Sequence, residues 1–159
     1  MILDIRCRSV FKWQFDIFEN DSLVADIDLK IWKEGADIEI KGEPFRIYRD
    51  GMFRGPYVLE AHRTELVRAK KTSVFKRRFE VDFAGRRFVL RATSIFRRTF
   101  TVTEEPVDGI GVEVGLIKAV KWYKYAAIAS FDDDLPMAID VFLIALVLMM
   151  WKRSAQSSS

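Results

Sequence analysis

Basic residues gather in the middle of the chain, and their chemistry is the most specific that the sequence offers. Residues 61–125 carry 15 Lys or Arg and 7 Asp or Glu, whereas residues 1–60 carry 9 and 12. Clustered Arg and Lys side chains are suited to phosphate groups, because one guanidinium can bind two oxygens at once. We therefore expect an anion-binding surface formed by Lys70, Lys71, Lys76, Arg78, Arg86, Arg87 and Arg97.

The alternation of side chains indicates which of these cations point outward. In the segment 72–79 the phenylalanines alternate with Lys76 and Arg78, so both cations face solvent if the phenylalanines face a core. The segment 93–100 repeats this pattern, and Arg97 takes the corresponding outward position. The alternative interpretation is a solvated charged face that only keeps the protein soluble.

Other kinds of chemistry find little support in the sequence. His62 is the only histidine and Cys7 the only cysteine, which disfavours a zinc site, a His-based catalytic triad and an internal disulfide. The sequence contains no glycine-rich nucleotide-binding loop. We therefore expect a protein that is not an enzyme, with no catalytic residues, no metal site and no cofactor.

The elements that position these residues are predicted to be short strands. Apolar and polar residues alternate along 23–31, 37–40, 57–61 and 110–116, and turn residues such as Gly55-Pro56 separate the runs. Many short strands at this spacing are typical of an all-β sandwich or barrel. Strands of about five or six residues would allow about twelve of them before residue 130.

The C-terminus changes character and predicts a helix. An acidic stretch at 132–134 and Pro136 are helix-start signals, and an unbroken apolar run follows from Val141 to Trp151. This run would be about 17 Å long, whereas a bilayer core is about 30 Å thick. A helix that is apolar on every side must be surrounded.

We therefore expect a mainly β fold, a closed antiparallel barrel of about twelve strands around a buried hydrophobic C-terminal α-helix. The predicted helix covers about 135–152, within a single domain at 1–153, and residues 154–159 are expected to form a disordered tail. The alternative is that the helix enters a membrane.

Asp140 is the one acidic residue within the predicted helix, and a buried charge needs a partner. Arg77 and Arg98 share the parity of the phenylalanines at matched positions of the repeat. We predict a structural ion pair between Asp140 and Arg77 or Arg98. The alternative is that both arginines lie at a barrel mouth and reach solvent.

Several segments resemble a known pattern. Residues 55–60 and 69–79 are similar to the scramblase-like and LURP-one-related arrangement, in which an aliphatic strand leads into a lysine-x-serine-x-x strand. The segment 93–100 is similar, as is the ending, in which 134–136 precede an apolar helix that closes with Trp-Lys-Arg.

The chain thus resembles the tubby C-terminal-like and phospholipid scramblase-like superfamily over residues 36–153, and is closest to its LURP-one-related branch. The resemblance implies a twelve-stranded barrel around a central helix. It also implies binding to membrane lipids, since tubby-like members bind phosphoinositides and scramblase members associate with membranes. The chain lacks the acidic calcium-binding loop of the scramblase branch, so lipid scrambling is not expected.

The function expected on these grounds is a non-enzymatic lipid- or anion-binding module at a membrane surface, whose basic face contacts phosphate groups. Anionic phospholipid is the expected partner, and the sequence does not identify a protein partner. A cytoplasmic location is expected, with or without peripheral attachment to a membrane. Nucleic acid is disfavoured, because the alternation sends the phenylalanines inward and leaves no rings for base stacking. The alternatives are a soluble macromolecule-binding or scaffold barrel, and a protein inserted in a membrane through its C-terminal helix.

Overall fold

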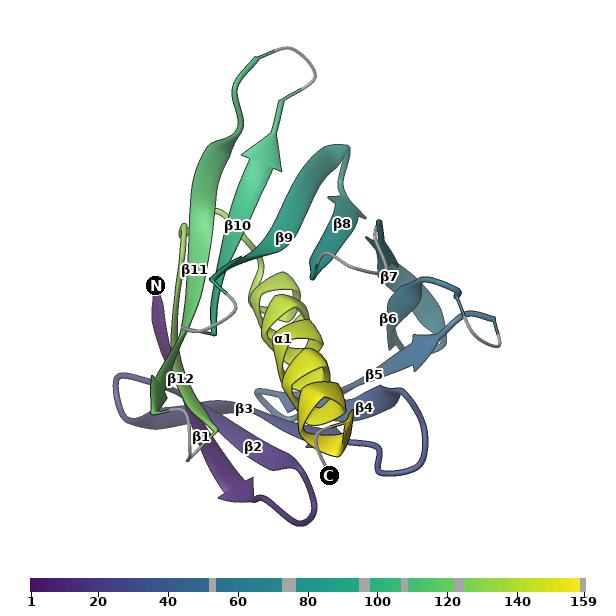
Figure 1. Ribbon diagram of the computed structural model, residues 1–159, viewed down its shortest axis with the longest axis vertical. Helices are drawn as coiled ribbons and strands as arrows, with labels where there is room; N and C mark the ends of the chain where they lie inside the picture. Colours follow the sequence, from purple (N-terminus) through teal and green to yellow (C-terminus); the bar gives the residue numbers. More distant parts are fainter. Residues whose placement is uncertain (52–53, 73–76, 95–97, 107–108, 122–124, 158–159) are drawn as a thin grey trace.

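The protein forms a β-barrel that encloses one helix (Figure 1). The computed structural model describes residues 1–51, 54–72, 77–94, 98–106, 109–121 and 125–157. The strands are β1 (Ile2–Ser9), β2 (Gln14–Glu19), β3 (Ser22–Leu29), β4 (Gly35–Ile40), β5 (Glu43–Arg49), β6 (Tyr57–Ala61), β7 (Thr64–Lys71), β8 (Arg78–Phe83), β9 (Arg86–Ser94), β10 (Thr99–Glu105), β11 (Val112–Lys121) and β12 (Ala126–Phe131), and the helix is α1 (Met137–Ser157).

The sheet closes on itself and leaves no free edge. Each strand pairs antiparallel with its neighbours in the chain, and β1 pairs with β12 from Ile2 opposite Ser130 to Ile5 opposite Ala127. Closure satisfies the backbone groups that an open edge strand would expose. The predicted closed barrel of about twelve strands is therefore confirmed.

The alternation of residues along the strands places the core inside the barrel. In β4, Ile38 and Ile40 are buried whereas Asp37 and Glu39 are exposed. Ile27 of β3 lies opposite Ile38, so the apolar faces of neighbouring strands coincide. Because successive side chains point to opposite faces of a sheet, this pattern lines the barrel with apolar groups.

Helix α1 fills the interior of the barrel, as predicted (Figure 1). Every residue from Ile139 to Leu148 is buried, including Phe142 at 0% exposure. The apolar run therefore finds its surroundings in the inner faces of the strands. In the described part of the chain, no helix is both long enough and apolar enough to cross a membrane.

The helix ends later than the sequence predicts. Residues 154–157 were expected to belong to a disordered tail, but α1 continues to Ser157. The hydroxyl of Ser154 accepts a hydrogen bond from Arg77 (3.0 Å). This bond ties the last part of the helix to the connection between β7 and β8.

Candidate functional site

The two ends of the barrel differ in charge. Because neighbouring strands are antiparallel, the hairpins after β1, β3, β5, β7, β9 and β11 share one end, and α1 finishes there. We call these hairpins, together with α1 from Trp151 onward, the basic end. Its described residues include two acids, Glu34 and Asp50, against eight cations: Lys12, Lys30, Lys33, Arg54, Arg77, Arg98, Lys152 and Arg153.

The opposite end, where α1 begins, carries the reverse excess. Its hairpins and the connection to α1 contain, within the described ranges, the cations Lys41 and Arg63 and four aspartates, Asp21, Asp132, Asp133 and Asp134. Charge segregation of this kind orients a molecule in the field of a charged partner. An anionic surface would therefore attract the basic end and repel the other.

The basic end also presents two aromatic rings to solvent. Phe11 in the β1–β2 hairpin is 95% exposed and Trp32 in the β3–β4 hairpin is 94% exposed. The opposite end exposes Ile110, but none of its described residues is an exposed aromatic. Large exposed rings beside cations are typical of a surface that contacts something, since folded proteins rarely leave them in water without need.

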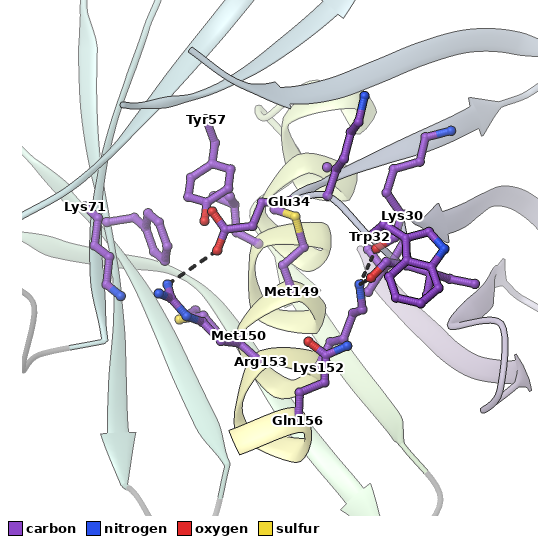
Figure 2. A pocket seen from close by; sticks show the side chains of 16 residues that line it. Lys30, Trp32, Glu34, Tyr57, Lys71, Met149, Met150, Lys152, Arg153 and Gln156 are labelled. Atoms are coloured by element: carbon purple, nitrogen blue, oxygen red, sulfur yellow. Dashed lines mark hydrogen bonds and ion pairs between the residues drawn. The ribbon is translucent and has the colours of Figure 1, made fainter. Parts of the chain in front are cut away.

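A pocket of about 170 Å³ opens at the basic end, between the last turns of α1 and the β3–β4 hairpin (Figure 2). Its floor is apolar and consists of Leu29, Phe79, Leu146, Met149 and Met150. Its mouth is mostly cationic and consists of Lys30, Lys33, Lys71, Lys152, Arg153 and one acid, Glu34. The combination suits a ligand with an apolar part and a negative charge.

Lys152 joins the helix to the hairpin at this mouth. Its side chain is 7% exposed, and its ammonium group donates hydrogen bonds to the backbone carbonyls of Lys30 and Ile31, the latter at 3.3 Å. Burial lowers the pKa of Lys152. The two carbonyls supply the polar partners that a buried ammonium requires.

Glu34 lies on the far side of the hairpin and meets two guanidinium groups. It accepts a hydrogen bond from Arg49 and forms an ion pair with Arg153 at 3.4 Å, which Figure 2 shows. Burial and the neighbouring Glu34 raise the pKa of Tyr57 to about 12, so this phenol stays protonated. Among the described residues that line the pocket, Glu34 is the one acid.

Lys71 is a half-buried cation of the pocket that lacks an acidic partner among the described residues. Within these residues its ammonium group has neither a hydrogen bond nor an ion pair. Its pKa is lowered, first by burial and then by the positive charges of Arg153, Arg49 and Arg77, while Glu34 acts in the opposite direction. An anion placed beside Lys71 would relieve this repulsion.

The structure separates the cations that the sequence grouped together. Arg86 lies at the opposite end of the barrel, where it binds Glu104 (2.7 and 2.8 Å) and Asp134 (2.9 Å). Arg87 binds Asp82 at 2.9 Å in the same region. Both guanidinium groups are thus occupied by carboxylates, and they do not share a surface with Lys71.

Two further predicted residues lie on the outer wall. Lys70 is exposed and stands opposite Glu80 in the β7–β8 pair. Arg78 points outward while its neighbour Phe79 is buried, and it approaches Glu80 and Glu105 at 3.8 and 3.7 Å. Lys76 and Arg97 lie outside the described residues.

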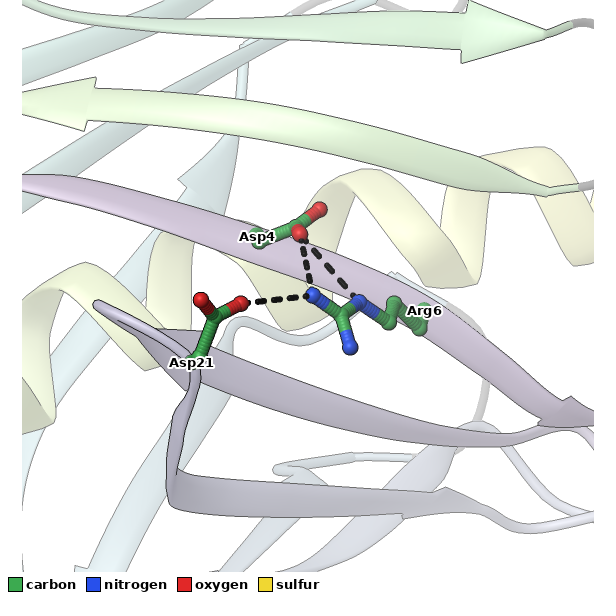
Figure 3. Close-up of polar contacts among 3 residues, drawn as sticks. All are labelled: Asp4, Arg6 and Asp21. Atoms are coloured by element: carbon green, nitrogen blue, oxygen red, sulfur yellow. Dashed lines mark hydrogen bonds and ion pairs between the residues drawn. The ribbon is translucent and has the colours of Figure 1, made fainter.

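Other arginines on the outer wall of the barrel also have acidic partners. Arg6 of β1 bonds Asp4 at 2.8 Å and reaches Asp21 at 3.5 Å (Figure 3). Arg8 binds Asp16 at 3.1 Å. Several cations of the outer wall thus have carboxylate partners, whereas the described cations of the basic end outnumber its acids.

The predicted ion pair of Asp140 is wrong. Asp140 is fully buried and neither of its carboxylate oxygens has a hydrogen-bond partner. Arg77 instead bonds Ser154, and Arg98 lies over the ring of Trp151 at 6.0 Å. Asp140 is in the first turn of α1, so at about 1.5 Å per residue these contacts are more than about 15 Å away along the helix.

Sequence reasoning missed most of the basic end. The missed residues are Phe11, Lys12, Trp32 and Lys33. They lie within residues 1–60, where acids outnumber cations, so the charge of this segment did not indicate an anion-binding surface. The sequence does contain a signal for this charge segregation, because alternate hairpins of an antiparallel barrel lie at the same end of the barrel. Summing the charges of every second turn would have shown the segregation.

Comparison with known proteins finds no match. No family model, no curated protein and no solved structure matches this chain. The likeness to the tubby-like and LURP-one-related proteins therefore stays a hypothesis, and function has to be argued from the geometry of the basic end.

Proposed function

We propose that this protein is a non-enzymatic module that docks its basic end on an anionic membrane surface. The observation that carries the proposal is that Phe11 and Trp32, both almost fully exposed, lie at the end that concentrates the cations. Each Lys or Arg near an anionic bilayer contributes about 1 kcal/mol of attraction. Tryptophan rings favour the level of the lipid headgroups, where one side of the ring is apolar and the other wet.

An orientation with the basic end toward the membrane is consistent with the positions of the acidic residues and of the apolar helix. The acidic end, with Asp132, Asp133 and Asp134, points away from the membrane when the basic end faces it. The apolar helix stays inside the barrel, where its surroundings are already apolar. Docking therefore requires no rearrangement of the fold.

Flotation of the full chain with liposomes tests the proposal. We expect binding to vesicles that contain anionic lipid, little binding to neutral vesicles, and release at high salt, since salt screens exposed charges over about 10 Å at 0.1 M. The double variants Lys12→Glu/Lys33→Glu and Phe11→Ser/Trp32→Ser should both lose most of this binding.

A matched control is available at the other end. Lys41→Glu/Arg63→Glu makes the same change in net charge on exposed turn residues and should leave flotation unaltered. An equal loss in this control would contradict docking through the basic end. Binding that survives high salt would instead support insertion of the C-terminal helix, and absence of all vesicle binding would favour a soluble macromolecular partner.

A further inference from the structure

We propose that the pocket at the basic end binds one anionic amphiphile, a phosphate monoester or carboxylate on an unbranched alkyl chain. The anion lies between Lys71 and Arg153, and the first methylene groups contact Met149 and Met150. This inference rests on the proposed function in using the same end of the barrel, and it deepens that function by naming a ligand class. The ligand can be a membrane lipid or a free amphiphile.

The floor of the pocket explains the apolar part of the ligand. Met149 and Met150 lie on the last apolar turns of α1, and with Leu146 and Phe79 they offer no polar side-chain group. Methionine side chains adapt to irregular apolar ligands because they are unbranched and polarisable. An engineered cavity of about 150 Å³ holds benzene, so the observed 170 Å³ accepts a few methylene groups and not a whole acyl chain.

The mouth of the pocket explains the charge of the ligand. Lys71 has no anionic partner within the described residues, and the cations Arg49, Arg77 and Arg153 act on it together. Arg153 reaches into the mouth from α1, as Figure 2 shows, and its guanidinium can bind two oxygens of one phosphate or carboxylate group. A negative headgroup between Lys71 and Arg153 therefore compensates charges that the protein itself leaves in excess.

Glu34 sets the strength of this binding. Its carboxylate holds Arg153 at 3.4 Å and also binds Arg49, so it competes with an incoming anion for the same guanidinium. Removing the negative charge of Glu34 should tighten ligand binding, whereas removing the positive charge of Lys71 should weaken it. General charge attraction would give the same two signs, so the discriminating comparison is Arg87→Gln, which makes the same charge change as Lys71→Gln at the opposite end of the barrel.

Titration calorimetry with octyl phosphate below its micellar concentration tests the pocket without any membrane. We expect saturable binding of one octyl phosphate per protein. Inorganic phosphate lacks the alkyl chain and octyl glucoside lacks the charge, so each should bind at least about tenfold more weakly. Octanoate distinguishes the two headgroups, and the tighter of octanoate and octyl phosphate identifies which anion the mouth prefers.

Variants localise the binding. Lys71→Gln should weaken octyl phosphate binding about tenfold, and Glu34→Gln should strengthen it a few-fold. Arg87→Gln, at the opposite end, is the control and should bind like the wild type. Thermal unfolding of each variant confirms that it is folded. Wild-type affinity in a folded Lys71→Gln, or octyl glucoside binding as tightly as octyl phosphate, would overturn the inference.

Flotation separates this inference from membrane docking and separates the two sources of ligand. If octyl phosphate fails to bind but anionic vesicles still do, the pocket inference fails and docking stands. If octyl phosphate binds but no vesicle does, docking fails and the ligand is a free amphiphile. A membrane source predicts that Lys71→Gln loses binding to vesicles with hexadecyl phosphate more than to vesicles of equal charge with phosphatidylglycerol, which has no phosphate monoester on an alkyl chain.

Discussion

The ammonium group of Lys152, near the end of the buried helix, donates a hydrogen bond to the backbone carbonyl of Ile31 at 3.3 Å. Ile31 precedes Trp32 in the β3–β4 hairpin, so the central helix directly holds the loop that presents an exposed ring. The core of the barrel and its candidate docking surface are thus connected by one side chain.

Replacing Lys152 by Met should loosen this hairpin. The substitution keeps an apolar stem of similar length but leaves the carbonyls of Lys30 and Ile31 without their donor, at a cost of about 1–3 kcal/mol. Hydrogen exchange should become faster in residues 30–34, and binding to anionic vesicles should weaken. Lys41→Met, in the exposed turn between β4 and β5 at the opposite end, makes the same change in charge and is the control. Unchanged exchange in the hairpin would refute the anchoring role of Lys152.

Asp140 should make the stability of the protein depend on pH. Burial raises its pKa from 3.8 to about 8; the positive charge of the Met1 amino group opposes this and Asp134 adds to it. Between these two pH values the folded protein holds a proton that the unfolded chain has lost. The free energy of unfolding should therefore fall as pH rises from about 4 to about 8, by several kcal/mol at about 1.36 kcal/mol per pKa unit.

Asp140→Asn removes the titrating group and should flatten this dependence, which denaturant titrations at pH 5 and pH 8 would measure. Asp133→Asn provides the comparison, because Asp133 is 89% exposed and pairs with the Met1 amino group at 2.9 Å. It should leave the fall in stability between these two pH values largely intact. Equal pH dependence in wild type and Asp140→Asn would show that Asp140 is not the responsible group.

Phe142 should be among the most sensitive positions for stability. Its ring is fully buried in the middle of the core, and truncation to Ala leaves a cavity inside a closed barrel that has little freedom to collapse. We expect a loss of about 3–5 kcal/mol in chemical denaturation. Ile128→Ala on β12, where the side chain is 45% exposed, should change stability by less than about 1 kcal/mol. Similar losses at both sites would contradict a core centred on the helix.

Arg86→Gln tests whether position or total charge governs membrane binding. Arg86 pairs with Glu104 and Asp134 at the end remote from the exposed rings. Partly exposed ion pairs of this kind contribute about 0–1 kcal/mol, so stability should fall only slightly. Flotation with anionic vesicles should match the wild type. A loss as large as that of Lys33→Gln, which makes the same change in net charge at the basic end, would mean that overall charge, and not the basic end, drives binding.

The architecture could be predicted from the sequence because it depends on local patterns. The alternation at Asp37–Ile40 is a property of adjacent residues, and it is enough to define which side of a strand is buried. The apolar run from Val141 to Trp151 is too short to span a bilayer and too apolar to face water, so an enclosing barrel follows from its length and composition.

Tertiary structure alone decided which charges meet. Lys12, Lys33 and Arg153 come from distant parts of the chain and share one end because antiparallel strands return every second hairpin to the same place. Asp140 and Arg77 carry opposite charges but lie near opposite ends of α1. The position of α1 in the barrel fixes Asp140, and the β7–β8 connection fixes Arg77. The sequence by itself determined the barrel and its buried helix through local periodicity and length, whereas strand register and barrel closure, which act between distant residues, determined the pocket and the basic end.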